Sequence, residues 1–196
     1  MPFDAPPYYH EYTTNKNLDN QADNENIYYF AYGSNMDDEQ MDRRRVNGVP
    51  YLQLLGVWPE TWGQEIGPAI PLGRAILKNY QLNFDKKSGN PQYCYASLYQ
   101  NLNALVEGVL YFLDKKLIKV LDFCEGVHCN QYTRELVEVS IGNEVFLALV
   151  YIAHPDFLTK GGIPCKSYLQ TILRGAEKFS LSDEYLTWLK MWEVAD

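Results

Sequence analysis

The chain has 196 residues, of which 46% are hydrophobic and 14% aromatic, a composition that supports one sizeable core and excludes a disordered protein. Its net charge of −8 argues against a nucleic-acid partner, and no apolar run approaches the ~20 residues of a membrane span. We therefore expect one globular domain that binds neither nucleic acid nor a membrane.

The first 26 residues are polar, aperiodic and rich in Asn, Asp, Pro and Thr. This composition predicts a disordered or loosely held tail at residues 1–26, before a domain at residues 27–196. The tail lacks the basic start and apolar centre of an export signal, so we expect a cytoplasmic protein. In that reducing compartment the four cysteines are expected to be free thiols.

The domain is predicted to begin with an aromatic strand at residues 27–32, followed by the loop Gly33–Asn35 and a helix. A glycine-led loop between a strand and a helix exposes backbone N–H groups, which makes it a candidate anion site. The helix carries three consecutive arginines, Arg43–Arg45, behind four acidic residues. We interpret these arginines as part of a solvated helix face rather than as a phosphate-binding patch.

Residues 49–73 contain several prolines and glycines together with Trp58 and Trp62, which predicts an irregular excursion. Three strands are predicted next, at residues 74–84, 93–99 and 106–114. A turn at residues 86–90 is expected to join the first two of them.

The second half of the chain shows clearer boundaries. A helix at residues 115–126 is expected to stop at Gly126, and a hairpin at residues 132–153 to turn at Gly142–Asn143. Two further helices are expected, from near Pro164 and after Ser182. This order of elements predicts an α+β domain around a mixed or closed sheet.

One carboxylate falls on an unexpected face of the predicted helix at residues 115–126. At ~100° per residue, one apolar arc gathers the side chains of Leu117, Val120, Leu121 and Cys124. Glu125 lies inside that arc. It could face water at a frayed helix end, form a buried ion pair, with Arg134 as a candidate partner, or carry a proton in apolar surroundings where desolvation raises a carboxyl pKa. Periodicity alone favours the first two interpretations.

Other arrangements of reactive residues point to no cofactor and no metal. Ser34 lacks the second glycine of a nucleophile elbow, and the histidines and cysteines lack zinc-site spacing. The sequence contains no phosphate-binding or dinucleotide-binding consensus.

Several motifs occur in one order along the chain: YFAYGSNM, AILKNYQLNF, EGVLYFL, LDFCEGVHCNQYTRELVEV and KSYLQTILRGAEKFSLSDEYL. In this order they resemble the γ-glutamylcyclotransferase family, including its avirulence-induced-gene-like branch, over most of the chain from residue 27. The resemblance implies an α+β fold with a mixed, barrel-like β-sheet flanked by helices.

The resemblance also implies a cofactor-independent enzyme, of lyase or acyltransferase type, that acts on a small-molecule γ-glutamyl substrate in glutathione metabolism. The α-amine of the γ-glutamyl group attacks its own γ-carbonyl, releasing 5-oxoproline and the attached amine or amino acid. Glu125 matches the family's general acid and base, which reverses the preference left by periodicity. The residues that match the substrate-binding positions are Tyr32, Gly33, Ser34, Asn35, Tyr132 and Tyr168.

Departures from the family pattern leave the substrate open. The segment at residues 49–73 is longer than usual and is a candidate protein-binding surface. The stretch before Ala96 is aromatic where relatives are often Gly-rich, so we expect a narrower pocket. The glutathione-specific branch tends to have Leu where this chain has Asn35, which argues against that specificity.

Two alternatives stay open at this point. One is another enzyme of the same fold, either a γ-glutamylamine cyclotransferase or an enzyme that deprotects a biosynthetic intermediate. The other is a non-catalytic binding module that presents Trp58 and Trp62 to a partner.

Overall fold

The computed structural model describes residues 26–54 (49–54 by their backbone alone) and 65–195. The predicted tail at residues 1–26, apart from Asn26, and the tryptophans Trp58 and Trp62 lie outside these described residues. The expectations for the tail and for a tryptophan surface therefore stay predictions.

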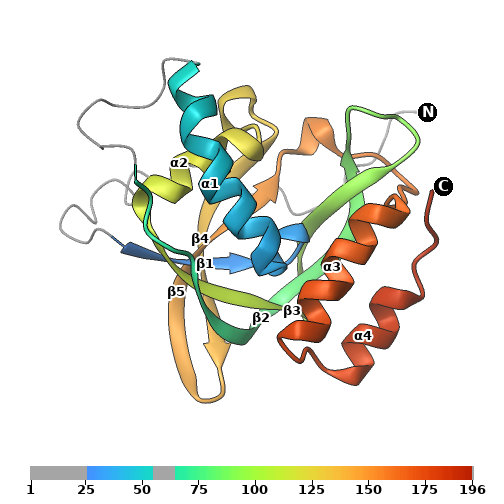
Figure 1. The fold of residues 1–196 in the computed structure, drawn as a ribbon. Coiled ribbons are helices and arrows are strands. Elements are labelled where there is room, and N and C mark those ends of the chain that lie inside the picture. The colour runs from blue at the N-terminus through green and yellow to red at the C-terminus, as the bar shows by residue number, and fades with distance from the viewer. Residues whose placement is uncertain (1–25, 55–64, 196) are drawn as a thin grey trace.

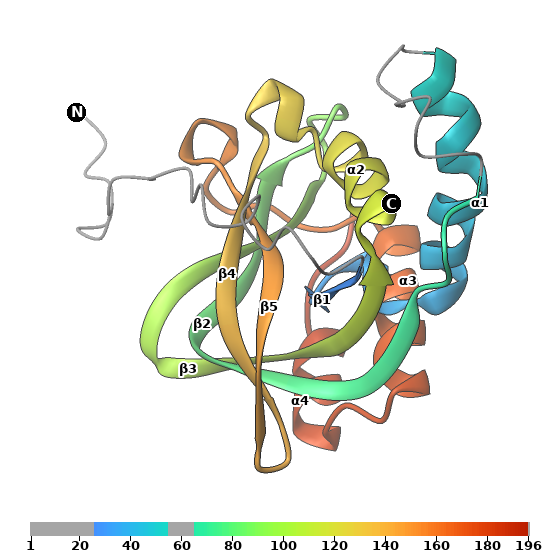
Figure 2. The same ribbon diagram turned by 90° about the vertical axis from the view of Figure 1, so that its left-hand side faces the viewer.

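Five strands close into a barrel, with the order β1-β3-β2-β4-β5 around its wall (Figure 2). The parallel pair β1–β5 joins the two ends of an otherwise antiparallel sheet, so the barrel is mixed, as predicted. The strands are β1 Asn26–Ala31, β2 Ile70–Lys87, β3 Cys94–Asp114, β4 Tyr132–Ile141 and β5 Glu144–Ala153.

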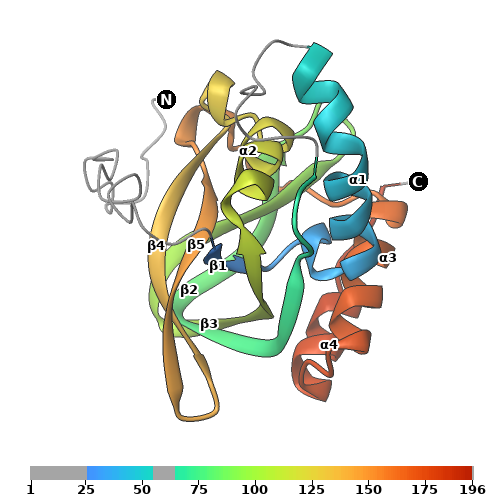
Figure 3. The same ribbon diagram turned by 60° about the vertical axis from the view of Figure 1, so that its left-hand side comes forward.

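Four α-helices flank the barrel, α1 and α2 side by side and α3 beside α4 (Figures 1 and 3). They are α1 Asp38–Leu54, α2 Lys115–Cys124, α3 Lys166–Lys178 and α4 Asp183–Lys190. Gly48 lets α1 approach α2, since a Cβ there would lie 2.3 Å from a methyl carbon of Val120. None of the described helices is long and apolar enough to cross a membrane.

The core fills the barrel and the space beneath its helices. Phe30 and Tyr111 from the strands and Leu117 and Leu121 from α2 are fully buried. Each such side chain contributes about 1.5–3 kcal/mol when it leaves water. The apolar side chains predicted for α2 therefore pack this helix against the barrel. This packing sets the position of its C-terminal end in space.

The long strands and the long first helix differ from the sequence prediction. The two strands expected at residues 93–99 and 106–114 are parts of the single strand β3, which bends where its pairing with β2 jumps from Lys78 to Tyr80. Asn79 lies at that point with a positive φ of 63°. The polar run between the two predicted strands thus follows from a bend within one strand and does not mark a chain break.

Residues 49–73 are less irregular than expected, because α1 continues to Leu54 and β2 begins at Ile70. The predicted hairpin with its Gly142–Asn143 turn is confirmed by β4 and β5. The two C-terminal helices are also confirmed, with Ser182 capping α4 by accepting a hydrogen bond from the Tyr185 N–H.

Candidate active site

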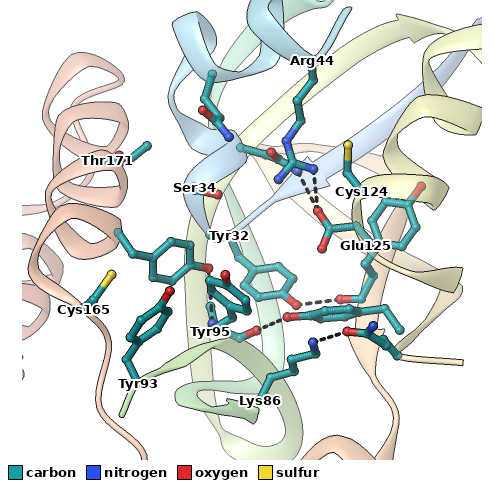
Figure 4. Close-up of a pocket in the computed structure, with 18 of the residues that line it drawn as sticks. Tyr32, Ser34, Arg44, Lys86, Tyr93, Tyr95, Cys124, Glu125, Cys165 and Thr171 are labelled. Atoms are coloured by element: carbon teal, nitrogen blue, oxygen red, sulfur yellow. Dashed lines mark hydrogen bonds and ion pairs between the residues drawn. The ribbon is translucent and has the colours of Figure 1, made fainter. Parts of the chain in front are cut away.

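A cavity of about 460 Å³ opens between one end of the barrel and the helices α1, α2 and α3. All seven residues singled out in the sequence line it, although they come from four separate parts of the chain (Figure 4). They are Glu125, Tyr32, Gly33, Ser34, Asn35, Tyr132 and Tyr168.

Glu125 stands at the C-terminal end of α2, where the helix stops. Its N–H still donates to the Leu121 carbonyl at 2.8 Å, whereas the next residue, Gly126, turns into the left-handed region with φ 66°. The glycine therefore ends the helix directly after the carboxylate. The Glu125 side chain points into the cavity and is 17% exposed.

Among the described residues, protein groups hold only one carboxylate oxygen of Glu125. Oε1 accepts hydrogen bonds from Arg44 Nη1 at 2.9 Å and from Asn35 Nδ2 at 3.3 Å. Oε2 accepts from no protein group among the described residues, and it is open to the cavity (Figure 4). Hydrogen bonds to Oε1 therefore orient the carboxylate, and Oε2 can contact a ligand in the cavity.

The surroundings of Glu125 correct two expectations. It lies among polar partners rather than in apolar surroundings, and Cys124, which was placed on the apolar arc, is exposed. The ion pair exists, but its cation is Arg44, since Arg134 pairs with Asp122 at 3.4 Å. Cys124 and Glu125 both lie at the C-terminal end of α2, which borders the cavity rather than the core.

Arg44 is a site residue that the sequence interpretation missed. It was assigned to a solvated face with its arginine neighbours, yet its side chain is 17% exposed and reaches Glu125. It follows the fully buried Met41 by three residues and precedes the buried Gly48 by four, so it lies on the inward face of α1. A helical projection alone does not separate Arg44 from Arg45, because both lie within about 60° of Gly48.

The loop after β1 presents backbone donors to the cavity. Within the described parts of the chain, the N–H groups of Gly33, Ser34 and Asn35 donate to no protein acceptor, while the Met36 N–H closes a short helical turn onto the Gly33 carbonyl at 3.0 Å. Asn35 is 5% exposed; its Nδ2 also donates to the Tyr29 hydroxyl at 2.9 Å, and its Oδ1 is buried without a partner in the described structure.

Packing from α3 and β3 holds this loop in place. The buried Asp37 pairs with Arg174, and the Tyr111 hydroxyl donates to the Met36 carbonyl at 3.1 Å. Gly175 allows α3 to touch the loop, because a Cβ there would lie 2.5 Å from the Met36 backbone. The donors of the loop are therefore fixed before any ligand arrives, which is the condition for electrostatic preorganisation.

Three tyrosines complete the wall next to the loop. Tyr32 donates to the Tyr151 carbonyl at 2.7 Å, and Tyr132 donates to the Ala96 carbonyl at 2.8 Å. The Ala96 N–H in turn donates to the Tyr168 hydroxyl at 3.2 Å. Burial is the main cause that raises the pKa of all three hydroxyls, and the nearby Glu125 carboxylate raises it further, so they stay protonated near neutral pH.

The opposite side of the cavity carries a second missed charge, Lys86. Instead of belonging to a turn, it lies in the last part of β2 with only 4% of its surface exposed. Its Nζ donates to Gln131 Oε1 at 2.5 Å and lies 5.4 Å from the ring centre of Tyr132. Burial lowers the pKa of Lys86, and the Glu125 carboxylate partly offsets that effect.

Aromatic side chains wall the part of the cavity between Lys86 and α3. Tyr93 and Tyr95, from the stretch before Ala96, both line the cavity, and the Tyr95 ring packs edge-on against Tyr168 at 5.1 Å between centres. Among the described residues, no group of three His, Cys, Asp or Glu side chains is arranged to hold a metal ion.

Comparison with known proteins agrees with this architecture. The sequence profile of the AIG2-like family matches residues 105–189. The putative γ-glutamylcyclotransferase YkqA of Bacillus subtilis (strain 168) is 31% identical over 167 residues, which are 84% of this chain and 51% of YkqA. These two matches support membership of the γ-glutamylcyclotransferase and AIG2-like family.

Solved structures show the same fold in this family. The crystal structure of B. subtilis YkqA matches with a TM-score of 0.66 and 28% identity, over 91% of this chain and 58% of that one. A γ-glutamyl cyclotransferase matches with a TM-score of 0.69 and 23% identity, over 88% of this chain and 90% of that one. The chain therefore spans about half the length of YkqA and nearly the full length of the second neighbour.

Proposed function

We propose that the protein is a γ-glutamylcyclotransferase-type enzyme that needs no cofactor. In the proposed reaction the α-amine of a γ-glutamyl group attacks its γ-carbonyl, a new C–N bond closes the five-membered lactam, and the original amide C–N bond breaks. The products are 5-oxoproline and the released amine or amino acid. The match to the AIG2-like family and the name of the relative YkqA support this proposal.

The observation that carries the proposal is the half-tethered carboxylate of Glu125. Cyclisation requires one proton to leave the attacking ammonium and one to reach the leaving nitrogen. Both nitrogens are attached to the former γ-carbonyl carbon in the tetrahedral intermediate, so a single carboxylate beside that carbon can serve both. Arg44 and Asn35 hold Oε1, and Oε2 is left to exchange these protons with the substrate.

The loop and the tyrosine wall supply the remaining requirements. Donors that are fixed before the reaction stabilise a developing oxyanion better than donors that must reorganise. The free N–H groups of Gly33, Ser34 and Asn35 can receive either the substrate carboxylate or that oxyanion.

The direct experiment is to incubate the protein with γ-glutamyl amino acids, γ-glutamyl-lysine and glutathione and to measure 5-oxoproline. We expect release from at least one donor, and a matched incubation with Glu125→Gln gives the background. A folded protein that releases 5-oxoproline from no donor would contradict the proposal and favour the binding-module alternative. We also propose, from the sequence, that residues 27–196 form one γ-glutamylcyclotransferase-like domain.

A further inference from the structure

Lys86 owes its position to an irregularity in the barrel. At the end of β2 the register shifts at Asp85, so that Phe84 pairs with Ala96 whereas Lys86 pairs with Tyr95. Such a bulge re-aims the side chain that follows it. The extra residue, Asp85, accepts hydrogen bonds from hydroxyls on β3, and Lys86 turns its ammonium into the cavity (Figure 4).

Lys86 is 4% exposed and has no ion-pair partner among the described residues. Nζ carries three N–H donors, and Gln131 takes one of them. The rings of Tyr95, Tyr132 and Phe157 surround it at 5.4–5.7 Å and stabilise a cation without offering an acceptor in its place. In the part of the chain that the structure describes, no carboxylate oxygen lies within the 4.0 Å of an ion pair with Lys86.

An arrangement of this kind is costly for a protein unless a ligand completes it. Charges that leave water are normally paired, and the other buried cation of this cavity, Arg44, is paired with Glu125. The aromatic rings cover part of the Lys86 ammonium, and the side chain lines the open cavity, where a ligand can accept from its remaining donors. The missing partner is therefore an anion that enters the cavity.

The cavity holds two separate features that suit anions. One is the set of free loop N–H groups at Gly33–Asn35, on the side of α1. The other is the Lys86 ammonium on β2, at the opposite side in Figure 4, where Ser34 and Lys86 are both labelled. A γ-glutamyl amino acid carries two carboxylates, one on the glutamyl part and one on the leaving part, whereas a γ-glutamylamine whose leaving amine has no carboxyl group carries only the first.

We propose that Lys86 binds the carboxylate of the leaving amino acid and so selects γ-glutamyl amino acids over γ-glutamylamines. This inference rests on the proposed function for the placement of the glutamyl part at the loop. A site with a buried charge discriminates strongly against a ligand that leaves that charge unpaired. Lys86 is thus a specificity-determining residue whose role is distinct from that of Glu125.

The test compares two ligands that differ only at the leaving group, γ-glutamyl-alanine and γ-glutamyl-ethylamide. Their dissociation constants are measured by titration calorimetry in a Glu125→Gln background, where turnover cannot consume them. We expect Lys86→Met to weaken binding of γ-glutamyl-alanine by about 10- to 100-fold, the range for a hydrogen bond to a charged group, and γ-glutamyl-ethylamide by about threefold or less.

Three further variants make the result specific. Lys86→Arg keeps the positive charge and should retain most of the affinity for γ-glutamyl-alanine. Lys87→Gln is the matched control: Lys87 is the next residue on the strand, is exposed, and donates to the Asp156 carbonyl away from the cavity. It should change neither constant. If Lys86→Met fails to give a cooperative thermal melt, Lys86→Gln replaces it.

Every outcome bears on the assignment. If Lys86→Met weakened the binding of both ligands equally, Lys86 would bind the glutamyl carboxylate, and the proposal would be overturned. Unchanged binding of both ligands, or no binding of either, would overturn it as well. Because binding is measured without turnover, the proposed function can fail separately: the wild-type protein would then release no 5-oxoproline, whichever way the Lys86 result falls.

Discussion

The two sides of the cavity treat a buried charge in different ways. On the side of α1 and α2, Arg44 and Glu125 neutralise each other at 2.9 Å, and Asn35 adds a further hydrogen bond. On the side of β2, Lys86 has an amide oxygen and aromatic faces around it but no carboxylate within ion-pair distance among the described residues. The ion pair fixes the positions of the Arg44 and Glu125 side chains, whereas the Lys86 ammonium keeps donors that a ligand can occupy. The comparison therefore separates residues that position the reaction from a residue that selects the substrate.

We expect the largest effect on kcat from replacing Glu125, the proposed proton carrier. Glu125→Gln retains an oxygen that can accept from Arg44 and Asn35, so the fold should survive, but the amide cannot exchange a proton. General acid–base catalysis contributes ~10²–10⁴ in rate, and we expect kcat to fall by at least that range with every donor. The measurement is 5-oxoproline release together with a thermal melt of the same preparation.

A control and a contrary result make this prediction strict. Glu138→Gln alters an exposed carboxylate on β4, outside the cavity lining, and should leave kcat and the melting temperature unchanged. A Glu125→Gln protein that melts early but keeps its turnover per folded molecule would show that Glu125 is a structural partner of Arg44 and not the proton carrier.

The next effect comes from removing the cation of the same pair. Arg44→Met leaves the Glu125 carboxylate, 17% exposed, with Asn35 as its remaining protein partner among the described residues. We expect a loss of about 1–3 kcal/mol in the free energy of unfolding, the cost of leaving a partly buried group without its partner. The carboxylate loses its fixed orientation, so kcat/KM should fall by ~10- to 100-fold.

The ligand pair sharpens the comparison for Arg44. Because Arg44 contacts the proton carrier and not the leaving group, its loss should lower kcat/KM for γ-glutamyl-alanine and γ-glutamyl-ethylamide by the same factor. Lys86→Met should instead lower the first much more than the second. If the effect of Arg44→Met differed between the two ligands, Arg44 would also contribute to substrate selection, and its role would not be separate from that of Lys86.

The different predictability of these residues has a physical origin. Glu125 and the loop Gly33–Asn35 carry local signals, since glycine follows the one and opens the other, and both line the same cavity. Arg44 and Lys86 each stand in a run of like charges, where composition predicts solvent. The position of Arg44 around the axis of α1 turns its side chain toward the cavity. The bulge at Asp85 does the same for the side chain of Lys86.

The fold shows the same division between local and long-range information. The Gly142–Asn143 turn and the cap at Ser182 are encoded by neighbouring residues, and the elements that they bound were predicted correctly. The continuity of β3 depends on pairing with β2 over its whole length, including a polar middle that carries no strand pattern. Only long-range pairing supplies that information.

A smaller effect is expected from the charge state of Lys86. Its pKa is lowered from 10.5 by burial, while Glu125 and Cys94, which face it, raise the pKa; the hydroxyls of Tyr95 and Tyr132 stay neutral over the same range. Carboxylate binding needs the charged ammonium. The preference for γ-glutamyl-alanine over γ-glutamyl-ethylamide should therefore be present at neutral pH and be lost as pH rises through a value below 10.5.

The ratio of the two dissociation constants, followed against pH in the Glu125→Gln background, measures this loss. The substrate α-amine titrates equally in both ligands, so its effect cancels in the ratio. Lys86→Arg should keep the preference to higher pH, because a guanidinium stays charged. A ratio that fell with the same midpoint in Lys86→Arg would assign the titration to another group.

The smallest expected effect tests the contact between the loop and the tyrosine wall. Gly33 has φ −113°, which other residues adopt, but a Cβ there would lie 3.1 Å from the Tyr168 hydroxyl and 3.6 Å from the Ala96 Cβ. Gly33→Ala should therefore shift Tyr168 by a few tenths of an ångström and lower kcat/KM by about 2- to 10-fold, since small displacements of positioned groups reduce rate.

Tyr168→Phe removes the oxygen that the new methyl group would meet, at the cost of the hydrogen bond from the Ala96 N–H. The double variant should thus be more active than the product of the two single effects, a coupling between neighbours that a double-mutant cycle measures. Additive effects in that cycle would show that the loop adapts without Tyr168, and that the donors at Gly33–Asn35 are less rigid than their packing against α3 indicates.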